Sequence, residues 1–175
     1  MRRLAEADRI RRFMRLLGAA ARKEASAYFT GGASAVLMGW RAATIDVDVA
    51  FVPDSDDLLR ALPDLKEQLE LNVELASPSD FLPELPGWKE RSVFVAREGK
   101  VSFFHYDFYA QALAKIERGH AQDRLDVRSM LDAGLVVPIT LRELLDAIVP
   151  ELYRYPAVDP AALRRAVVEA LTGRT

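Results

Sequence analysis

Apolar and polar residues follow one another along the first part of the chain with the periods of short strands and amphipathic helices. Apolar residues recur every three or four positions between residues 3 and 24, which predicts a helix. Strict alternation over residues 45–52 predicts a strand with one buried face, formed by Ile45, Val47, Val49 and Phe51. Further strands are predicted at 27–30 and 70–76, and a hairpin is predicted at 91–109.

The remaining patterns are helical. A short apolar helix is expected at 33–40 and a helix with acidic residues at its start at 54–69, with Pro63 near a break. Later helices are expected at 108–118, 121–133, 140–149 and 159–172. Strands and helices alternate first and helices alone follow, which predicts an α/β (α+β) fold with appended C-terminal helices. We expect two parts, residues 1–107 and residues 108–175.

Composition narrows the chemistry that the chain can carry out. Its 175 residues are half apolar and 29% charged, which is typical of a globular domain, and no apolar run is long enough to cross a bilayer. There is no cysteine and there are two histidines, so disulfides, thiolate nucleophiles and a nitrogen-rich zinc site are disfavoured. We therefore expect a cytoplasmic protein whose metal, where it binds one, is a hard cation held by oxygens.

Charge is spread unevenly, although the net charge of the whole chain is only −2. The first 24 residues contain three acids and eight basic residues: Arg2, Arg3, Arg9, Arg11, Arg12, Arg15, Arg22 and Lys23. Two interpretations stay open for this segment. It is a phosphate-binding face, or it is the solvated surface of an ordinary helix.

Two aspartates, Asp46 and Asp48, interrupt the apolar strand at 45–52. Residues two apart on a strand share a face and lie roughly 6.5–7 Å apart, so these carboxylates repel each other when both are ionised. A divalent cation removes that repulsion, and Glu74 on the polar face of the next predicted strand would join the pair if the strands are neighbours. The sequence thus predicts Asp46, Asp48 and Glu74 as metal ligands and catalytic residues.

A Gly-Gly pair stands between the preceding strand and the short helix. Gly31 and Gly32 let the backbone approach a phosphate closely, and Ser34 adds a hydroxyl donor two positions later. A glycine pair or an Asp-x-Asp strand by itself is weak evidence, because ordinary turns and surface strands contain both. Their succession in one short unit favours a site for phosphates and a metal ion.

The segment GGASAVLMGWRAATIDVDVAF resembles the signature of polymerase-β-type nucleotidyltransferases. More narrowly it is similar to AbiEii-type toxin nucleotidyltransferases, which carry Arg, Ser or Thr just before Asp-x-Asp, here Arg41 and Thr44. A second segment, ALAKIERGHAQDRLDV, resembles the helical motif of that group. The motif maps onto Lys115, Arg118, Asp123 and Asp126, and the similarity covers most of residues 28–130.

The resemblance implies a small mixed sheet and a nucleotide between that sheet and the helical part. It implies transfer of a nucleoside monophosphate from a nucleoside triphosphate to a hydroxyl group, with Mg²⁺ or Mn²⁺ bound. Arg41 would neutralise the leaving pyrophosphate, and Lys115, oriented by Asp123, would reach the triphosphate. The partners implied are the triphosphate, a tRNA end or a protein as acceptor, and a cognate antitoxin protein.

Two features depart from the pattern of the group. Ser34 falls two places after the second glycine, and the third acid is Glu74 rather than an aspartate. Two other functions stay open: a catalytically silent nucleotide-binding regulatory or antitoxin-type partner with the same fold, and a sugar transferase that uses Asp-x-Asp with a nucleotide sugar.

Overall fold

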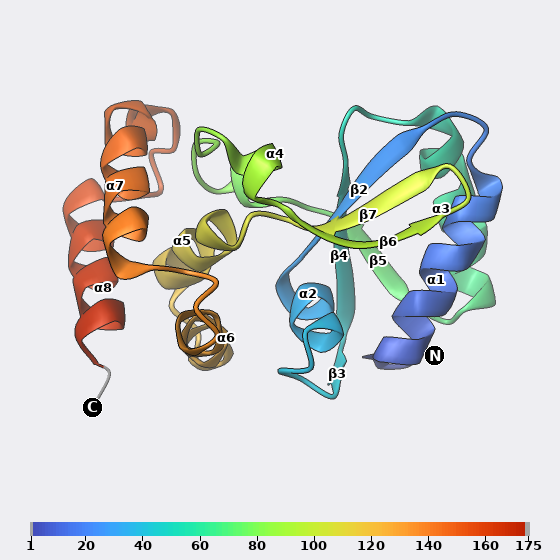
Figure 1. Ribbon diagram of the computed structural model, residues 1–175, viewed down its shortest axis with the longest axis horizontal. Helices are drawn as coiled ribbons and strands as arrows, with labels where there is room; N and C mark the ends of the chain where they lie inside the picture. The colour runs from blue at the N-terminus through green and yellow to red at the C-terminus, as the bar shows by residue number, and fades with distance from the viewer. Residues whose placement is uncertain (1, 174–175) are drawn as a thin grey trace. The chain divides into compact units, whose positions relative to one another are not determined.

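The computed structural model describes residues 2–173 (Figure 1). Over these residues the chain forms eight α-helices, a two-stranded antiparallel sheet and a five-stranded mixed sheet. The order in the larger sheet is β5-β4-β2-β7-β6. Its strands are β2 (Ala25–Thr30), β4 (Asp46–Phe51), β5 (Asn72–Leu75), β6 (Val93–Glu98) and β7 (Val101–His105). The predicted mixed α/β class is confirmed.

The pairing of the strands combines a hairpin with two parallel neighbours. β4 lies antiparallel to β2 and parallel to β5, while β7 lies parallel to β2 and antiparallel to β6. The β6–β7 hairpin turns at Gly99, whose φ of 56° is a conformation that glycine adopts without steric cost. The predicted hairpin is therefore present, and the register of β4 places Asp48 between Thr30 on β2 and Glu74 on β5.

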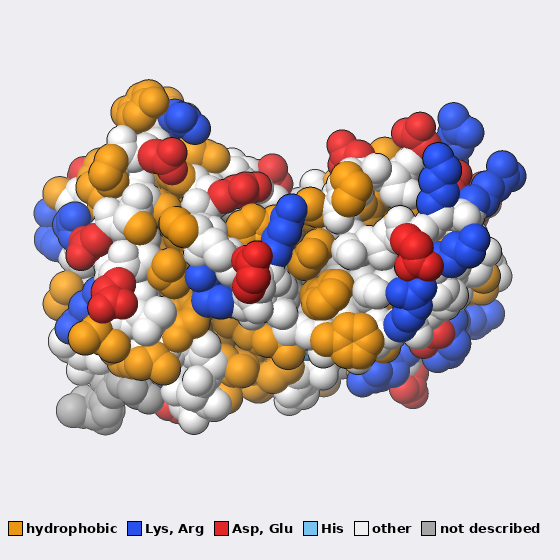
Figure 2. Space-filling model, turned by 45° about the horizontal axis from the view of Figure 1, so that its top comes forward, with side chains coloured by type: hydrophobic (Ala, Val, Ile, Leu, Met, Phe, Trp, Pro, Cys, Tyr) orange, Lys and Arg blue, Asp and Glu red, His pale blue; other side chains and the backbone are white. Residues whose placement is uncertain are grey.

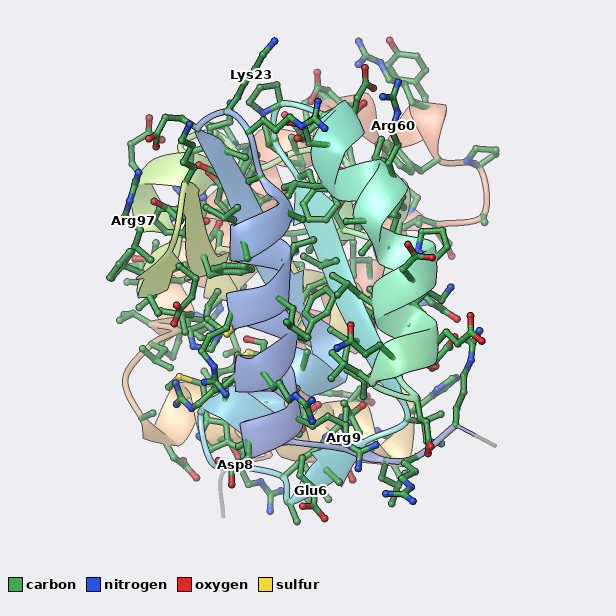
Figure 3. The ribbon with its side chains drawn as sticks, turned by 90° about the vertical axis from the view of Figure 1, so that its right-hand side faces the viewer. Glu6, Asp8, Arg9, Lys23, Arg60 and Arg97 are labelled. Atoms are coloured by element: carbon green, nitrogen blue, oxygen red, sulfur yellow. The ribbon has the colours of Figure 1, made fainter. Side chains whose placement is uncertain are left out.

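One face of the sheet packs on two helices, α1 (Ala7–Ala20) and α3 (Asp56–Gln68), which lie side by side across it (Figure 3). The apolar stripe of α1 that the periodicity predicted is buried there. The alternate residues of the strands complete this core. Its members from α1 and the strands include Ile10, Phe13, Met14, Leu17, Phe29, Val47, Val49 and Phe103.

The structure differs from the predicted elements at three places. The helix expected from residue 3 begins only at Ala7, because Ala5–Glu6 forms β1 and pairs with β3 (Ala43–Thr44). Pro63 lies within α3 without ending it, because the buried leucines of α3 hold the helix on the core. Ile45 is 71% exposed instead of facing the core, because it precedes β4 and the alternation of the strand begins at Asp46.

The chain divides into two compact units. The sheet, α1, α3 and the short helix α2 (Gly31–Leu37) belong to the first unit, which comprises residues up to Ser77 and Ser92–Tyr106. The second unit comprises Pro78–Arg91 and the residues from Asp107 onward. Its helices are η1 (Pro78–Asp80), α4 (Trp88–Arg91), α5 (Phe108–Arg118), α6 (Ala121–Asp132), α7 (Pro138–Ile148), η2 (Val149–Arg154) and α8 (Pro160–Thr172).

Asp107 holds together two parts of the second unit that are distant in the sequence. Its fully buried carboxylate accepts hydrogen bonds from Arg91 at the end of α4, the shorter one at 2.7 Å, and from the backbone N–H of Tyr109. The second bond caps the N-terminus of α5, which satisfies a donor that has no partner within the helix. Among residues 2–173, no helix has the length and apolar composition needed to cross a membrane.

Candidate active site

Three acidic side chains share the face of the sheet opposite α1 and α3. The valines of β4 point into the core, so the alternation of the strand directs Asp46 and Asp48 to the other face. Glu74 lies in register with Asp48 on the parallel neighbour β5. Residues in register on adjacent strands lie about 5 Å apart and share a face, so the acids predicted from the sequence are neighbours across two strands.

Asn72 connects two of these carboxylates. It lies in register with Asp46, and its amide nitrogen donates to Oδ1 of Asp46 and, at 3.1 Å, to Oε1 of Glu74. The amide offsets part of the negative charge on this face. Sequence reasoning placed Asn72 on the polar face of its strand but gave it no function; its spacing of two residues from Glu74 was the only signal.

Carboxylate oxygens are the donor atoms that Mg²⁺ and Mn²⁺ prefer, so the chemistry of this set fits a hard divalent cation. Within residues 2–173, however, no group of three or more His, Cys, Asp or Glu side chains is gathered closely enough to hold a metal ion. The Asn72 amide lies between Asp46 and Glu74 instead. The metal-binding roles of the three acids stay predictions.

The Gly-Gly turn lies against the acidic strand. β2 ends at Thr30, which is in register with Asp48, and α2 begins at Gly31 with a φ of 60°. A Cβ atom built on Gly31 would lie 2.7 Å from Oδ2 of Asp48, closer than such contacts occur. The backbone conformation of residue 31 therefore favours glycine, and a larger residue there would have to move the Asp48 carboxylate, so the turn and the acid form one local structure.

Gly32 brings two more of the predicted residues to the same place. A Cβ atom there would overlap the hydroxyl of Thr44 and lie 3.2 Å from Nη1 of Arg41. The Thr44 hydroxyl donates to the backbone carbonyl of Asp46 at 3.1 Å. A guanidinium, a hydroxyl and a backbone without side chains thus adjoin the start of α2, next to the strand that carries the acids.

Ser34 lies in a different environment from the one that a phosphate ligand would need. It is 1% exposed, and its Oγ lies 2.7 Å from Nδ1 of His105, the last residue of β7. Burial lowers the pKa of His105 to about 4, so the imidazole is neutral near pH 7. The phosphate role of Ser34 stays a prediction, and the pairing with His105 was not indicated by the sequence.

Lys115 and Asp123 lie in the second compact unit and form an ion-pair cluster with Asp126 and Arg118. The ammonium group of Lys115, 5% exposed, lies 2.7 Å from Asp126 and 3.6 Å from Asp123. Burial acts to raise the pKa of Asp123, but the hydrogen bonds from Arg118 and the charge of Lys115 outweigh it and hold that pKa below its usual value. The cluster joins α5 to α6, and the nucleotide-binding roles of Lys115 and Asp123 stay predictions.

Comparison with known proteins gives one match. A family model described as "Nucleotidyltransferase of unknown function (DUF6036)" matches residues 8–156, well over half of the chain. The matched segment contains the Gly-Gly turn, the three acids and the ion-pair cluster. No curated protein and no solved structure matches the chain.

Proposed function

The chain belongs to this family of nucleotidyltransferases, and on that premise we propose that it moves a nucleoside monophosphate from a nucleoside triphosphate to a hydroxyl acceptor and releases pyrophosphate. The observation that carries the proposal is the contact between Gly31 and Asp48. Such a reaction requires the phosphate groups of the nucleotide and the catalytic carboxylates to lie close together. The turn and the strand supply both.

In this proposal Asp46, Asp48 and Glu74 would hold a divalent cation, Mg²⁺ or Mn²⁺. The bound cation would supply positive charge for the phosphate oxygens and lower the pKa of the acceptor hydroxyl. Glu74 lies exposed on the edge strand of the sheet, where it would be the group that accepts the proton of that hydroxyl. Asn72 keeps the carboxylates of Asp46 and Glu74 in place through its amide.

The phosphates bind at the start of α2. Gly31 and Gly32 have no side chains to keep a phosphate away from the backbone. Arg41, beside Gly32, places a positive charge where the pyrophosphate leaves. The hydroxyl of Thr44 donates a hydrogen bond to the backbone carbonyl of Asp46 and so holds the segment before β4 against the first residue of that strand. The proposal assigns no phosphate contact to Ser34, whose buried hydroxyl lies against His105, or to Lys115 and Asp123, which are ion-paired within the second unit.

The resemblance to AbiEii-type toxins supports a narrower version of the proposal. In that version the acceptor is a tRNA 3′ end or a protein hydroxyl, the transfer is toxic to the cell, and an antitoxin protein restrains it. The support is the pair Arg41 and Thr44 before the acidic strand and the cluster around Lys115.

Label transfer tests the proposal. The purified protein is incubated with Mg²⁺ or Mn²⁺, each of the common α-labelled triphosphates, and either total tRNA or a cell extract, and label in RNA, label in protein and pyrophosphate release are followed. We expect transfer by the wild type and a loss of at least about 100-fold in Asp46→Asn and Asp48→Asn. Asp54→Asn, an exposed acid just beyond β4, is the matched control and should retain full activity.

Two outcomes would contradict this function. Equal transfer by the wild type and the Asp46 and Asp48 variants would remove these residues from the reaction. Tight triphosphate binding in calorimetry without label transfer or pyrophosphate release would favour the catalytically silent nucleotide-binding partner instead.

A further inference from the structure

The outer side of α1 and the loop after it carry five basic side chains that the proposed site does not use. These residues, named the cationic face from here on, are exposed and form no ion pair within residues 2–173: Arg11, Arg12, Arg15, Arg22 and Lys23. Figure 2 shows Lys and Arg side chains gathered over this part of the first unit, and Figure 3 places Lys23 just beyond the end of α1.

Nearby acids neutralise the cationic face only in part. Glu6 and Asp8 lie at the N-terminal end of α1, at the opposite end from Lys23 (Figure 3), and only Asp8 stands one helical turn from residues of the face, Arg11 and Arg12. Glu24 is paired with Arg97 at 2.6 Å. Asp57 of α3 accepts a hydrogen bond from the backbone N–H of Arg22 rather than from its guanidinium.

Positive charge is concentrated in the N-terminal segment, although the rest of the chain is net negative. Residues 1–24 carry eight basic and three acidic side chains, a net +5, whereas the remaining residues carry 16 basic and 23 acidic side chains, a net −7. Arg11 and Arg15 stand one helical turn apart, and like charges at that spacing destabilise a helix by a few tenths of a kcal/mol. A partner that brings negative charge relieves this repulsion.

We propose that the cationic face binds the phosphate backbone of a nucleic acid and thereby anchors the acceptor of the transfer reaction; the acceptor role rests on the proposed function. Four of the five residues are arginines, whose planar guanidinium groups bind phosphates through two parallel hydrogen bonds. The large apolar residues of α1, including Phe13, are buried in the core, except for Leu16, which is partly buried against it. The cationic face is therefore suited to contact phosphate groups and not to recognise bases. It also lacks the exposed apolar side chains with which an interfacial helix enters a membrane.

The position of the cationic face separates binding from chemistry. α1 covers the core side of the sheet, while Asp46 and Asp48 lie on the other side. A nucleic acid on the cationic face is therefore held away from the acids, and only a second segment of the same molecule reaches them. Loss of the face should raise the KM for a nucleic acid acceptor and leave kcat at saturation unchanged.

Fluorescence anisotropy with labelled RNA and DNA of about 30 nucleotides, between about 50 and 200 mM salt, tests the proposal. We expect the wild type to bind with an affinity that falls steeply with salt. The triple variant Arg11→Gln, Arg12→Gln, Arg15→Gln should bind at least about 10-fold more weakly, with a log–log salt slope reduced by about 2 to 3. The matched control, Arg128→Gln, Arg142→Gln, Arg165→Gln, removes three exposed arginines of the second unit and should bind like the wild type.

The nucleic acid that binds more tightly identifies the source of the phosphates. Equal losses in the two triple variants, tighter binding to polyglutamate than to either nucleic acid, or tighter binding to anionic lipid vesicles would each overturn the proposal.

A further variant, Asp46→Asn with Asp48→Asn, distinguishes this inference from the proposed function. It should bind nucleic acid like the wild type although it cannot transfer a nucleotide. If the wild-type protein transfers label but binds no nucleic acid, the proposed role of the cationic face is overturned and the proposed function is not. Protein that binds through the face but transfers no label overturns the proposed function and the acceptor role together.

Discussion

Gly31 and Asp48 lie against each other at a point where the backbone conformation favours glycine and a larger residue would have to move the Asp48 carboxylate. The backbone of Gly31 has a φ of 60°, and a Cβ atom there would lie 2.7 Å from Oδ2 of Asp48. Gly31 follows Thr30, the last residue of β2, and Thr30 pairs with Asp48 on β4, so the Gly-Gly turn lies next to the acidic strand. The geometry of the turn and the position of the carboxylate therefore depend on each other.

Replacement of Gly31 by alanine should impair transfer more than it impairs folding. The left-handed conformation costs roughly 1–2 kcal/mol for a residue with a Cβ atom, and the new methyl group must also displace Asp48. We expect urea denaturation to show a loss of about that size and the transfer assay to show a much larger loss. Gly39→Ala is the control, since Gly39 has a φ of 83° but nothing within 4 Å of its Cβ position. Equal activity losses in the two variants would show that the contact with Asp48 is unimportant.

His105 should make the protein less stable in mild acid. Its pKa is about 4 in the folded protein and 6.5 when unperturbed, because burial disfavours the charged imidazole. Between these pH values the unfolded chain binds a proton that the folded chain does not, so the free energy of unfolding falls as the pH falls from 6.5 to 4, in total by about 3 kcal/mol. Urea denaturation across this range checks the slope. His105→Asn should remove this part of the pH dependence, and an unchanged slope would contradict the assignment.

Lys115 should contribute strongly to the stability of the second unit. Its ammonium group lies between the buried carboxylates of Asp123 and Asp126. Lys115→Met removes the ammonium group that lies 2.7 Å from the buried Asp126 carboxylate, while Arg118 still pairs with Asp123, and we expect a loss of about 3–5 kcal/mol in the free energy of unfolding. Arg164→Gln breaks the exposed ion pair with Asp146 in the same unit and should cost less than about 1 kcal/mol. Similar losses in both variants would mean that the Lys115 cluster is not a buried network.

Asn72 should substitute for a cation on the acidic face. Asn72→Ala removes the amide between Asp46 and Glu74, and we expect it to lower the free energy of unfolding by about 1 kcal/mol without divalent ions.

Mg²⁺ at about 100 times its dissociation constant should raise the free energy of unfolding of the wild type by about 2.7 kcal/mol at constant ionic strength. The same stabilisation in Asp46→Asn with Asp48→Asn would show that the cation binds elsewhere.

Features that repeat over a few neighbouring residues could be predicted from the sequence. The apolar stripe of α1, the alternation of β4 and the β6–β7 hairpin are local patterns, and the structure confirms them. The same alternation is sufficient to place Asp46 and Asp48 on one face. Pairings between distant segments are not visible as a local sequence pattern. The β1–β3 ladder joins residues about 40 positions apart, and the hydrogen bond between Ser34 and His105 joins residues 71 positions apart.

The sequence by itself determined which side chains of β4 leave the core, because a strand turns each successive residue to the opposite face. Only the tertiary structure decided their neighbours. Register between β4, β2 and β5 depends on the packing of the whole core, which no single segment contains. That register brings Glu74 beside Asp48, puts the Asn72 amide between two carboxylates and places Gly31 against the Asp48 carboxylate.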